Sequence, residues 1–210
     1  MAWSSLFYLL FNVGVFFVWW LINSFFIPLG LKFVPDYWNP DTLFDLGRIT
    51  GGFAIEDGIF MFFVGGIAAV VYEYSFRKRI VLRRSYKPHI RALVIGLLFA
   101  VLFMILFQLN PIWFLIVFGV AGAIALCVER PDLIRHSFFG GVTFTLLYGV
   151  AFVFFLLLFP EFIERVYNLN ALSGISFLGI PLEEFLYAFS FGLLWAPLYE
   201  YAHGEKCVDE

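Results

Sequence analysis

Six long apolar runs constrain the fold of this chain more than any other feature. Their lengths approach the roughly 17 to 25 residues that a membrane-spanning helix needs. They lie at about 3–27, 51–73, 91–108, 111–128, 137–159 and 180–201. Hydrophobic residues make up 62% of the chain and charged residues only 14%, against about 25% charged in soluble domains. We therefore predict an all-α integral membrane protein, a single polytopic domain over residues 1–210 with about six transmembrane helices.

The basic residues predict the orientation of these helices, because Lys and Arg gather in short cytoplasmic loops. The segment from Arg77 to Arg91 holds seven of the 13 basic residues. With this segment inside, ten basic residues lie on the cytoplasmic side and three on the outer side. We expect a multi-pass protein of the cell membrane with both termini in the cytoplasm.

Two stretches of the chain repeat each other at a spacing of 127 residues. Residues 55–74 align without a gap on 182–201, and seven of the 20 aligned positions are identical, where chance gives roughly two. We interpret this as an internal duplication with copies at about 1–74 and 128–201 and intervening helices at about 91–128. Because the copies lie four crossings apart, helices one and two should run parallel to helices five and six, as a parallel repeat.

Each copy carries an adjacent acidic pair near the outer end of an apolar run. Glu56 and Asp57 lie about five residues into one run, on the order of 8 Å deep, and Glu183 and Glu184 occupy the equivalent positions in the other. A charged group at the centre of a membrane helix costs about 2.5 to 3.5 kcal/mol, and burial beside a like charge favours a protonated carboxyl group. Two such pairs could supply one proton donor and one proton acceptor. The alternative is a structural role, such as hydrogen bonding to Arg48 or to irregular backbone.

Aromatic side chains follow these acids at helical spacing. Phe60 and Phe63 come four and seven residues after Glu56, and Tyr187 comes four residues after Glu183, so each set shares a helix face. Aromatic faces stabilise cations. We expect Phe60, Phe63 and Tyr187 to bind an apolar substrate.

Other kinds of site find little support in the sequence. The three histidines, at positions 89, 136 and 203, lack metal-ligand spacing, so we predict no metal. Neither a G-x-G-x-x-G nor a P-loop pattern occurs, and we predict no cofactor. The basic loop fits a topology signal better than a nucleic-acid surface, so we expect no nucleic-acid partner.

The run Pro-Leu-Glu-Glu-Phe-Leu-Tyr at 181–187, duplicated in a small polytopic chain, resembles the lycopene cyclase domain of the membrane-embedded carotenoid cyclases. That family occurs as two fused copies in one chain or as two separate subunits. The resemblance implies that the two acidic pairs are the catalytic residues. The first copy differs in having Ala54 at the position of the proline, and Glu-Asp as its acidic pair.

The resemblance also implies a redox-neutral cyclisation of lycopene that needs no cofactor. A carboxylic acid would protonate the terminal double bond, and the neighbouring double bond would close a six-membered ring onto the tertiary carbocation. A carboxylate would then remove a proton, which gives a product of the β-carotene type. Water must be excluded, because it would hydrate the cation. The implied partners are a hydrophobic polyene and the lipid bilayer.

Two rival functions use the same features. A related membrane terpene or carotenoid cyclase, or a carotenoid hydratase, would use the same acids. A small proton-coupled transporter with parallel repeats would use them as coupling groups, but it needs a polar path to both faces. The acids cluster at one depth and the predicted spans hold few Ser, Thr or Asn, which favours an enzyme.

Overall fold

A computed structural model of the protein describes residues 10, 14, 33–50, 54–76, 78–82 and 90–209. Over these residues the chain is mostly helical, as predicted. The first predicted span, 3–27, lies outside the described residues except for positions 10 and 14, so this helix stays a prediction.

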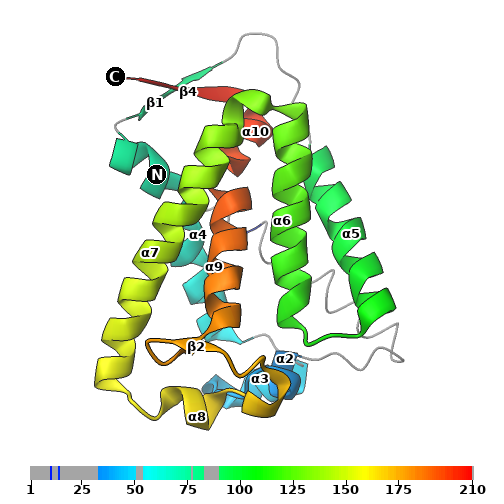
Figure 1. Ribbon diagram of the computed structural model, residues 1–210, viewed down its shortest axis with the longest axis vertical. Coiled ribbons are helices and arrows are strands. Elements are labelled where there is room, and N and C mark those ends of the chain that lie inside the picture. Colours follow the sequence, from blue (N-terminus) through cyan, green and yellow to red (C-terminus); the bar gives the residue numbers. More distant parts are fainter. Residues whose placement is uncertain are drawn as a thin grey trace.

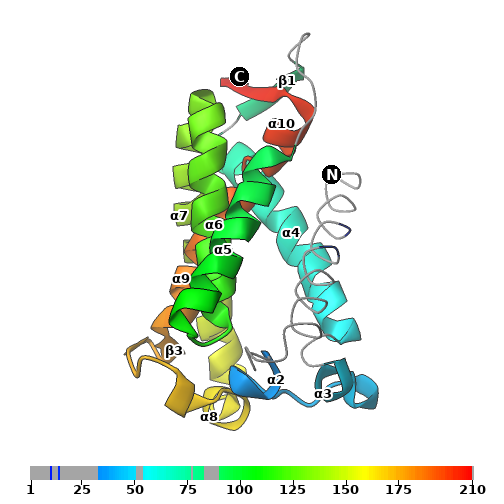
Figure 2. The ribbon, with the colours of Figure 1, turned by 90° about the vertical axis from the view of Figure 1, so that its right-hand side faces the viewer.

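Five long helices form the body of the described part of the chain (Figure 1). They are α4 (Ile55–Phe76), α5 (Arg91–Phe107), α6 (Ile112–Glu129), α7 (Ile134–Leu158) and α9 (Leu182–Trp195). Helix α9 is central, because it packs against α4, α6 and α7, while α5 packs against α6. The view in Figure 2 shows α4 leaning away from α5 and α6.

Short elements gather at the two ends of these helices (Figure 1). One end, here called the loop end, carries α2 (Phe33–Asp36), η2 (Leu43–Asp45), α3 (Leu46–Thr50), α8 (Phe162–Val166), η4 (Leu169–Ala171) and the hairpin of β2 (Ser176–Phe177) and β3 (Ile180–Pro181). The opposite end carries η3 (Pro131–Leu133), α10 (Leu198–His203) and the antiparallel pair of β1 (Lys78–Leu82) and β4 (Glu205–Asp209).

Glycines allow the central helices to approach closely. A Cβ atom on Gly192 of α9 would lie 2.8 Å from the carbonyl oxygen of Gly140 in α7, and one on Gly119 of α6 would lie 2.6 Å from the carbonyl oxygen of Ser190 in α9. Small residues at helix contacts are typical of membrane bundles, where close van der Waals packing drives association. The two contacts fix α9 between α6 and α7.

Two helical segments are long and apolar enough to cross a membrane, within the residues that the structure describes: Ile112–Glu129 and Pro131–Leu158. A third span arises if the bent pair Leu43–Thr50 and Ile55–Ala68, with an angle of 90°, counts as one. Helix α5 is a shorter apolar helix. The described residues therefore support a membrane protein with two or three candidate spans, and the full set of six stays a prediction.

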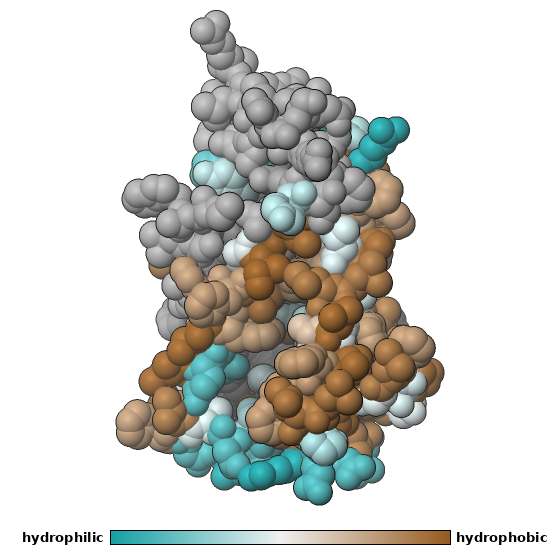
Figure 3. Space-filling view, turned by 90° about the vertical axis from the view of Figure 1, so that its left-hand side faces the viewer, coloured by the Kyte–Doolittle hydropathy of each residue, from teal (hydrophilic) through white to brown (hydrophobic). Residues whose placement is uncertain are grey.

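The outer surface of these helices is apolar, as contact with lipid requires. Leu146, Val150 and Leu157 of α7 are 64%, 69% and 75% exposed. The face in Figure 3 is apolar through its middle, hydrophilic at the loop end and hollowed beside that end. This distribution fits a molecule whose middle lies in hydrocarbon and whose loop end lies at the interface.

The helices of the two proposed copies begin and end in register. Helix α4 spans Ile55–Phe76, and α9 and α10 together span Leu182–His203, which is the same interval moved by 127 residues. The second copy is broken after Trp195 because Pro197 has no N–H to continue the helical hydrogen bonds. The duplication itself stays a prediction.

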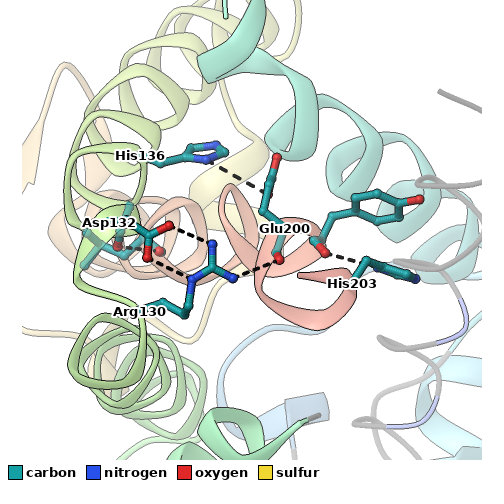
Figure 4. Close-up of polar contacts among 8 residues, drawn as sticks. Arg130, Asp132, His136, Glu200 and His203 are labelled. Carbon is teal, nitrogen blue, oxygen red and sulfur yellow. Dashed lines mark hydrogen bonds and ion pairs between the residues drawn. The ribbon is translucent and has the colours of Figure 1, made fainter. Parts of the chain in front are cut away.

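A network of polar residues, in which Arg130, His136 and Glu200 are buried, holds α10 at the end of the bundle opposite the loop end (Figure 4). Arg130 forms two hydrogen bonds of 2.8 Å to Asp132 and a third, of 3.4 Å, to the carbonyl oxygen of Glu200. His136 Nδ1 lies 4.0 Å from Oε2 of Glu200, and the Tyr201 hydroxyl donates to Glu129 at 2.7 Å. The network joins α10 to α6 and α7.

Candidate active site

Both acidic pairs lie in the first turn of a helix at the loop end. Helix α4 begins at Ile55 and α9 at Leu182, so the acids lie closer to the helix ends than the predicted five residues. In the second copy the difference arises because apolar residues before α9, such as Ile180 in strand β3, continue the hydrophobic run without being helical. The partial positive charge of a helix N-terminus favours carboxylates at these positions.

The first acid of each pair binds the backbone of a preceding loop. Oε1 of Glu56 accepts the N–H of Leu43 at 2.8 Å, and Oε1 of Glu183 accepts the N–H of Ser173 at 2.6 Å. Glu183 is buried and Glu56 is exposed. In both copies this carboxyl group therefore ties the start of the helix to the loop before it.

The second acids of the two pairs differ in their partners. Oδ2 of Asp57 accepts the N–H of Ala54 at 2.7 Å, which is the bond that an acidic side chain in the first turn makes to the N-cap residue. Pro181 takes the place of Ala54 in the second copy, and proline has no N–H to donate. Glu184 cannot form the equivalent bond, so its carboxyl group is available to other donors.

Three tyrosine hydroxyls donate to Glu184, and we call them the tyrosine cage: Tyr37, Tyr148 and Tyr167. Oε1 accepts from Tyr37 and, at 3.0 Å, from Tyr167, while Oε2 accepts from Tyr148 at 2.5 Å. Glu184 is only 4% exposed. An apolar ring with a hydroxyl tip can bring a donor into such surroundings, and the cage provides a buried carboxyl group with hydrogen bonds that water would otherwise make.

Two loops at the loop end, one containing Tyr37 and the other Tyr167, are joined by backbone hydrogen bonds. Asn39 donates its N–H to the carbonyl oxygen of Val166 at 2.7 Å, and Asn168 donates to that of Tyr37 at 2.9 Å. The rings of Tyr37 and Tyr167 meet edge to face, with centroids 5.5 Å apart. Burial first, and then the charge of Glu184, raise the pKa of both hydroxyls well above the ordinary tyrosine value, so both remain protonated donors at neutral pH.

An apolar cavity of about 590 Å³ lies beside this cage. Glu56, Asp57 and Glu184 border it, together with the three tyrosines of the cage. The rest of its wall is mostly aromatic and aliphatic, and includes Phe60, Phe114, Phe118, Phe144, Phe152, Phe155, Phe162, Tyr187, Phe191 and Trp195. Carboxyl groups from both acidic motifs thus face one hydrophobic space.

The predicted site residues are distributed unevenly around this cavity. Phe60 and Tyr187 line it, whereas Glu183 and Phe63 are not among its lining residues. Phe63 is 61% exposed. The stripe of α4 that borders the cavity runs through Asp57, Phe60, Val64 and Ile67, so Phe63 lies beside this stripe rather than on it.

The tyrosine cage is the part of the site that the sequence analysis missed. In the sequence, Tyr37 and Tyr148 lie far from both acidic pairs, and Tyr167 comes 17 positions before Glu184. The sequence offered only a general indication of the cage. A buried carboxyl group needs hydrogen-bond donors, and few side chains in the apolar runs can donate a hydrogen bond. Within the described residues no group of three or more His, Cys, Asp or Glu side chains is arranged to hold a metal ion.

The fold and the site together define a class, a helical membrane protein in which carboxyl groups border an apolar cavity. Residues 110–202, somewhat less than half of the chain, match the family model described as lycopene cyclase. The match includes the second acidic pair, Tyr148 and Tyr167, and it confirms the resemblance drawn from the motif at 181–187. No curated protein and no solved structure matches the chain.

Proposed function

We propose that the protein is a lycopene cyclase that converts the linear end group of the carotenoid into a six-membered ring. One observation carries the proposal: carboxyl groups of both acidic motifs border a single apolar cavity. The cavity suits a hydrocarbon, because its wall buries apolar surface with few polar partners. The family match of residues 110–202 supports the same substrate class.

The reaction requires only proton transfer and carbon–carbon bond formation. A carboxylic acid gives its proton to the terminal double bond, the next double bond attacks the tertiary cation, and a carboxylate takes a proton from the new ring. The product is an isomer of the substrate, so no oxidant or reductant is consumed. Two carboxyl groups in different surroundings can divide the acid and base roles.

Glu56, Asp57 and Glu184 are the proposed catalytic residues because all three border the cavity. Glu183 is part of the same proposed machinery, and its bond to Ser173 fits a role in positioning its neighbour. Phe60 and Tyr187 offer aromatic faces to a cation in the cavity. Phe63, which is exposed, is proposed to meet the part of the polyene that stays outside the cavity.

We further propose that the chain crosses the cell membrane six times as a parallel repeat with cytoplasmic termini. The common interval of α4 and of α9 with α10 supports the repeat. The basic segment from Arg77 to Arg91 supports the orientation. On this topology the loop end and the cavity lie toward the outer face.

Pigment analysis tests the proposed function. Cells that accumulate lycopene should turn from red to yellow-orange on expression of the protein and should contain a cyclic isomer of lycopene. The Glu184→Gln variant should leave the cells red, whereas the matched control Glu164→Gln, at an exposed position of α8, should give the wild-type colour. Unchanged lycopene with well-expressed, membrane-inserted protein would contradict the proposal, and a product heavier by one water would indicate a hydratase.

A further inference from the structure

We propose that the two acidic motifs have opposite roles: Glu184, held as a carboxylate by the tyrosine cage, accepts the proton, and Asp57 donates it. This inference rests on the proposed function and assigns the acid and the base within it. It makes Tyr37, Tyr148 and Tyr167 positioning residues, which act on the reaction through Glu184.

The number of hydroxyl groups around Glu184 bears on its protonation state, because three of them lie within hydrogen-bonding distance of its two oxygens. In the described part of the chain, Glu184 is the acceptor of the Tyr148 and Tyr167 hydroxyls, and it also accepts from Tyr37. An ionised carboxyl group is an acceptor only and accommodates all three hydrogens. A protonated Glu184 would donate to one tyrosine oxygen and displace that tyrosine's own hydrogen. Since hydrogen bonds to the charged form favour it, the cage fits an anion.

An ionised Glu184 has no proton for the first step, so the donor must be another acid on the cavity wall. Glu56 and Asp57 are the two that remain. Within the described residues, Asp57 accepts one hydrogen bond, through Oδ2, from Ala54, which leaves Oδ1 to carry a proton. Asp57 is less exposed than Glu56, and a proton held there is better shielded from water. We therefore assign the donor role to Asp57.

Pro181 explains how the two copies acquired different roles. Asp57 and Glu184 are equivalent positions, but only Asp57 has an N-cap N–H within reach, that of Ala54. The proline in the second copy removes that donor. Glu184 is thereby free to enter the cage, while its equivalent in α4 keeps a single backbone partner.

The protons balance over one cycle. Asp57 gives its proton to the less substituted carbon of the terminal double bond, where a new C–H bond forms, and the ring closes by a new C–C bond. The Glu184 carboxylate then removes a carbon-bound proton, and the electrons of that C–H bond become the ring double bond. The cycle ends with ionised Asp57 and protonated Glu184. Exchange with solvent after the product leaves restores both groups.

The pH dependence of the rate distinguishes this assignment from its reverse. Initial rates of lycopene cyclisation are measured over a range of pH with the detergent-solubilised full chain, for wild type and for Tyr148→Phe and Tyr167→Phe. Loss of one donor makes Glu184 easier to protonate, so we expect the acidic limb of the profile to move up by about one pH unit. The rate on that limb should fall about tenfold and recover at higher pH. Tyr74→Phe, at a position that is 88% exposed on α4, should leave the profile unchanged.

Two results would overturn the inference while leaving the proposed function intact. If the cage variants move the basic limb upward instead, Glu184 is the acid and Asp57 the base. If they lower the rate equally at every pH, the tyrosines support the shape of the site and do not control Glu184. Tyr148 lies in α7 and Tyr167 directly follows α8. If one of the two variants misfolds, the pH profile of the other still tests the inference. A wild-type protein that cyclises no lycopene would overturn both proposals.

Discussion

Asn168 donates its backbone N–H to the carbonyl oxygen of Tyr37 at 2.9 Å. This bond joins two loops that lie far apart in the sequence, and it places Tyr37 and Tyr167 on the same oxygen of Glu184. The site is therefore assembled from segments far apart in the sequence: α4 supplies Asp57 and α9 supplies Glu184. Neither half alone contains the arrangement on which the proposed chemistry depends.

Glutamine substitution should separate the two members of the second acidic pair. Glu184→Gln keeps the shape of the side chain but cannot exchange a proton with the substrate, so we expect cyclisation to be lost. Glu183→Gln retains a carbonyl oxygen for the N–H of Ser173, and we expect it to keep a measurable fraction of the rate. Chromatography of pigments from lycopene-accumulating cells compares the two variants. Equal loss in both, with equal expression, would contradict the distinction.

The ring of Tyr187 should matter more than its hydroxyl. This residue lines the cavity and is not a member of the tyrosine cage, so its proposed contribution is the aromatic face. Tyr187→Phe should retain most of the activity, whereas Tyr187→Leu should lower the rate roughly 2-fold to 30-fold, as expected for the loss of one cation–π contact. Initial rates on lycopene measure both. A larger loss in the phenylalanine variant than in the leucine variant would exclude this role.

The polar network around Arg130, at the end of the bundle opposite the loop end, should affect the stability of the protein and not the cyclisation reaction. Arg130 is 3% exposed and holds Asp132 and the backbone of Glu200. Water can reach Asp132 once its partner is removed, because this side chain is partly exposed. Arg130→Ala should therefore lower the free energy of unfolding by about 1 to 3 kcal/mol. Arg130→Lys should restore little of this loss, since lysine cannot form the paired hydrogen bonds. Thermal unfolding in detergent measures the loss. The cyclisation rate per folded molecule should stay at the wild-type level, and a selective loss of rate would indicate a catalytic role.

Much of this architecture could be predicted from the sequence. The apolar runs predicted the positions of α5, α6 and α7, and the repeated motif located the acids that border the cavity. The break at Pro197 and the starts of α4 and α9 were not predicted, because hydropathy does not distinguish apolar helix from the apolar strand and turn residues beside it. The tyrosine cage could not be predicted, since Tyr37 meets Glu184 only through tertiary contact between the loops.

Alkaline solution should destabilise the protein through the buried tyrosines. Burial, and then the charge of Glu184, raise the pKa of Tyr37 and of Tyr167, whereas tyrosine in an unfolded chain ionises near pH 10, at roughly its reference value. The folded state keeps protons that the unfolded state loses, so this stabilisation is complete below about pH 10 and declines above it. We expect Tyr37→Phe to unfold less steeply with rising pH than wild type in the same range. An identical alkaline decline in both would show that another group is responsible.

The central claim is that carboxyl groups in the cavity transfer protons to and from an alkene. Cyclisation of lycopene in deuterated water, followed by mass spectrometry of the pigment, tests it most directly. The exchangeable proton of Asp57 becomes carbon-bound and the proton removed comes from carbon, so each ring formed should carry one deuterium. A cyclic product without deuterium, or a product that contains an added water, would contradict the account.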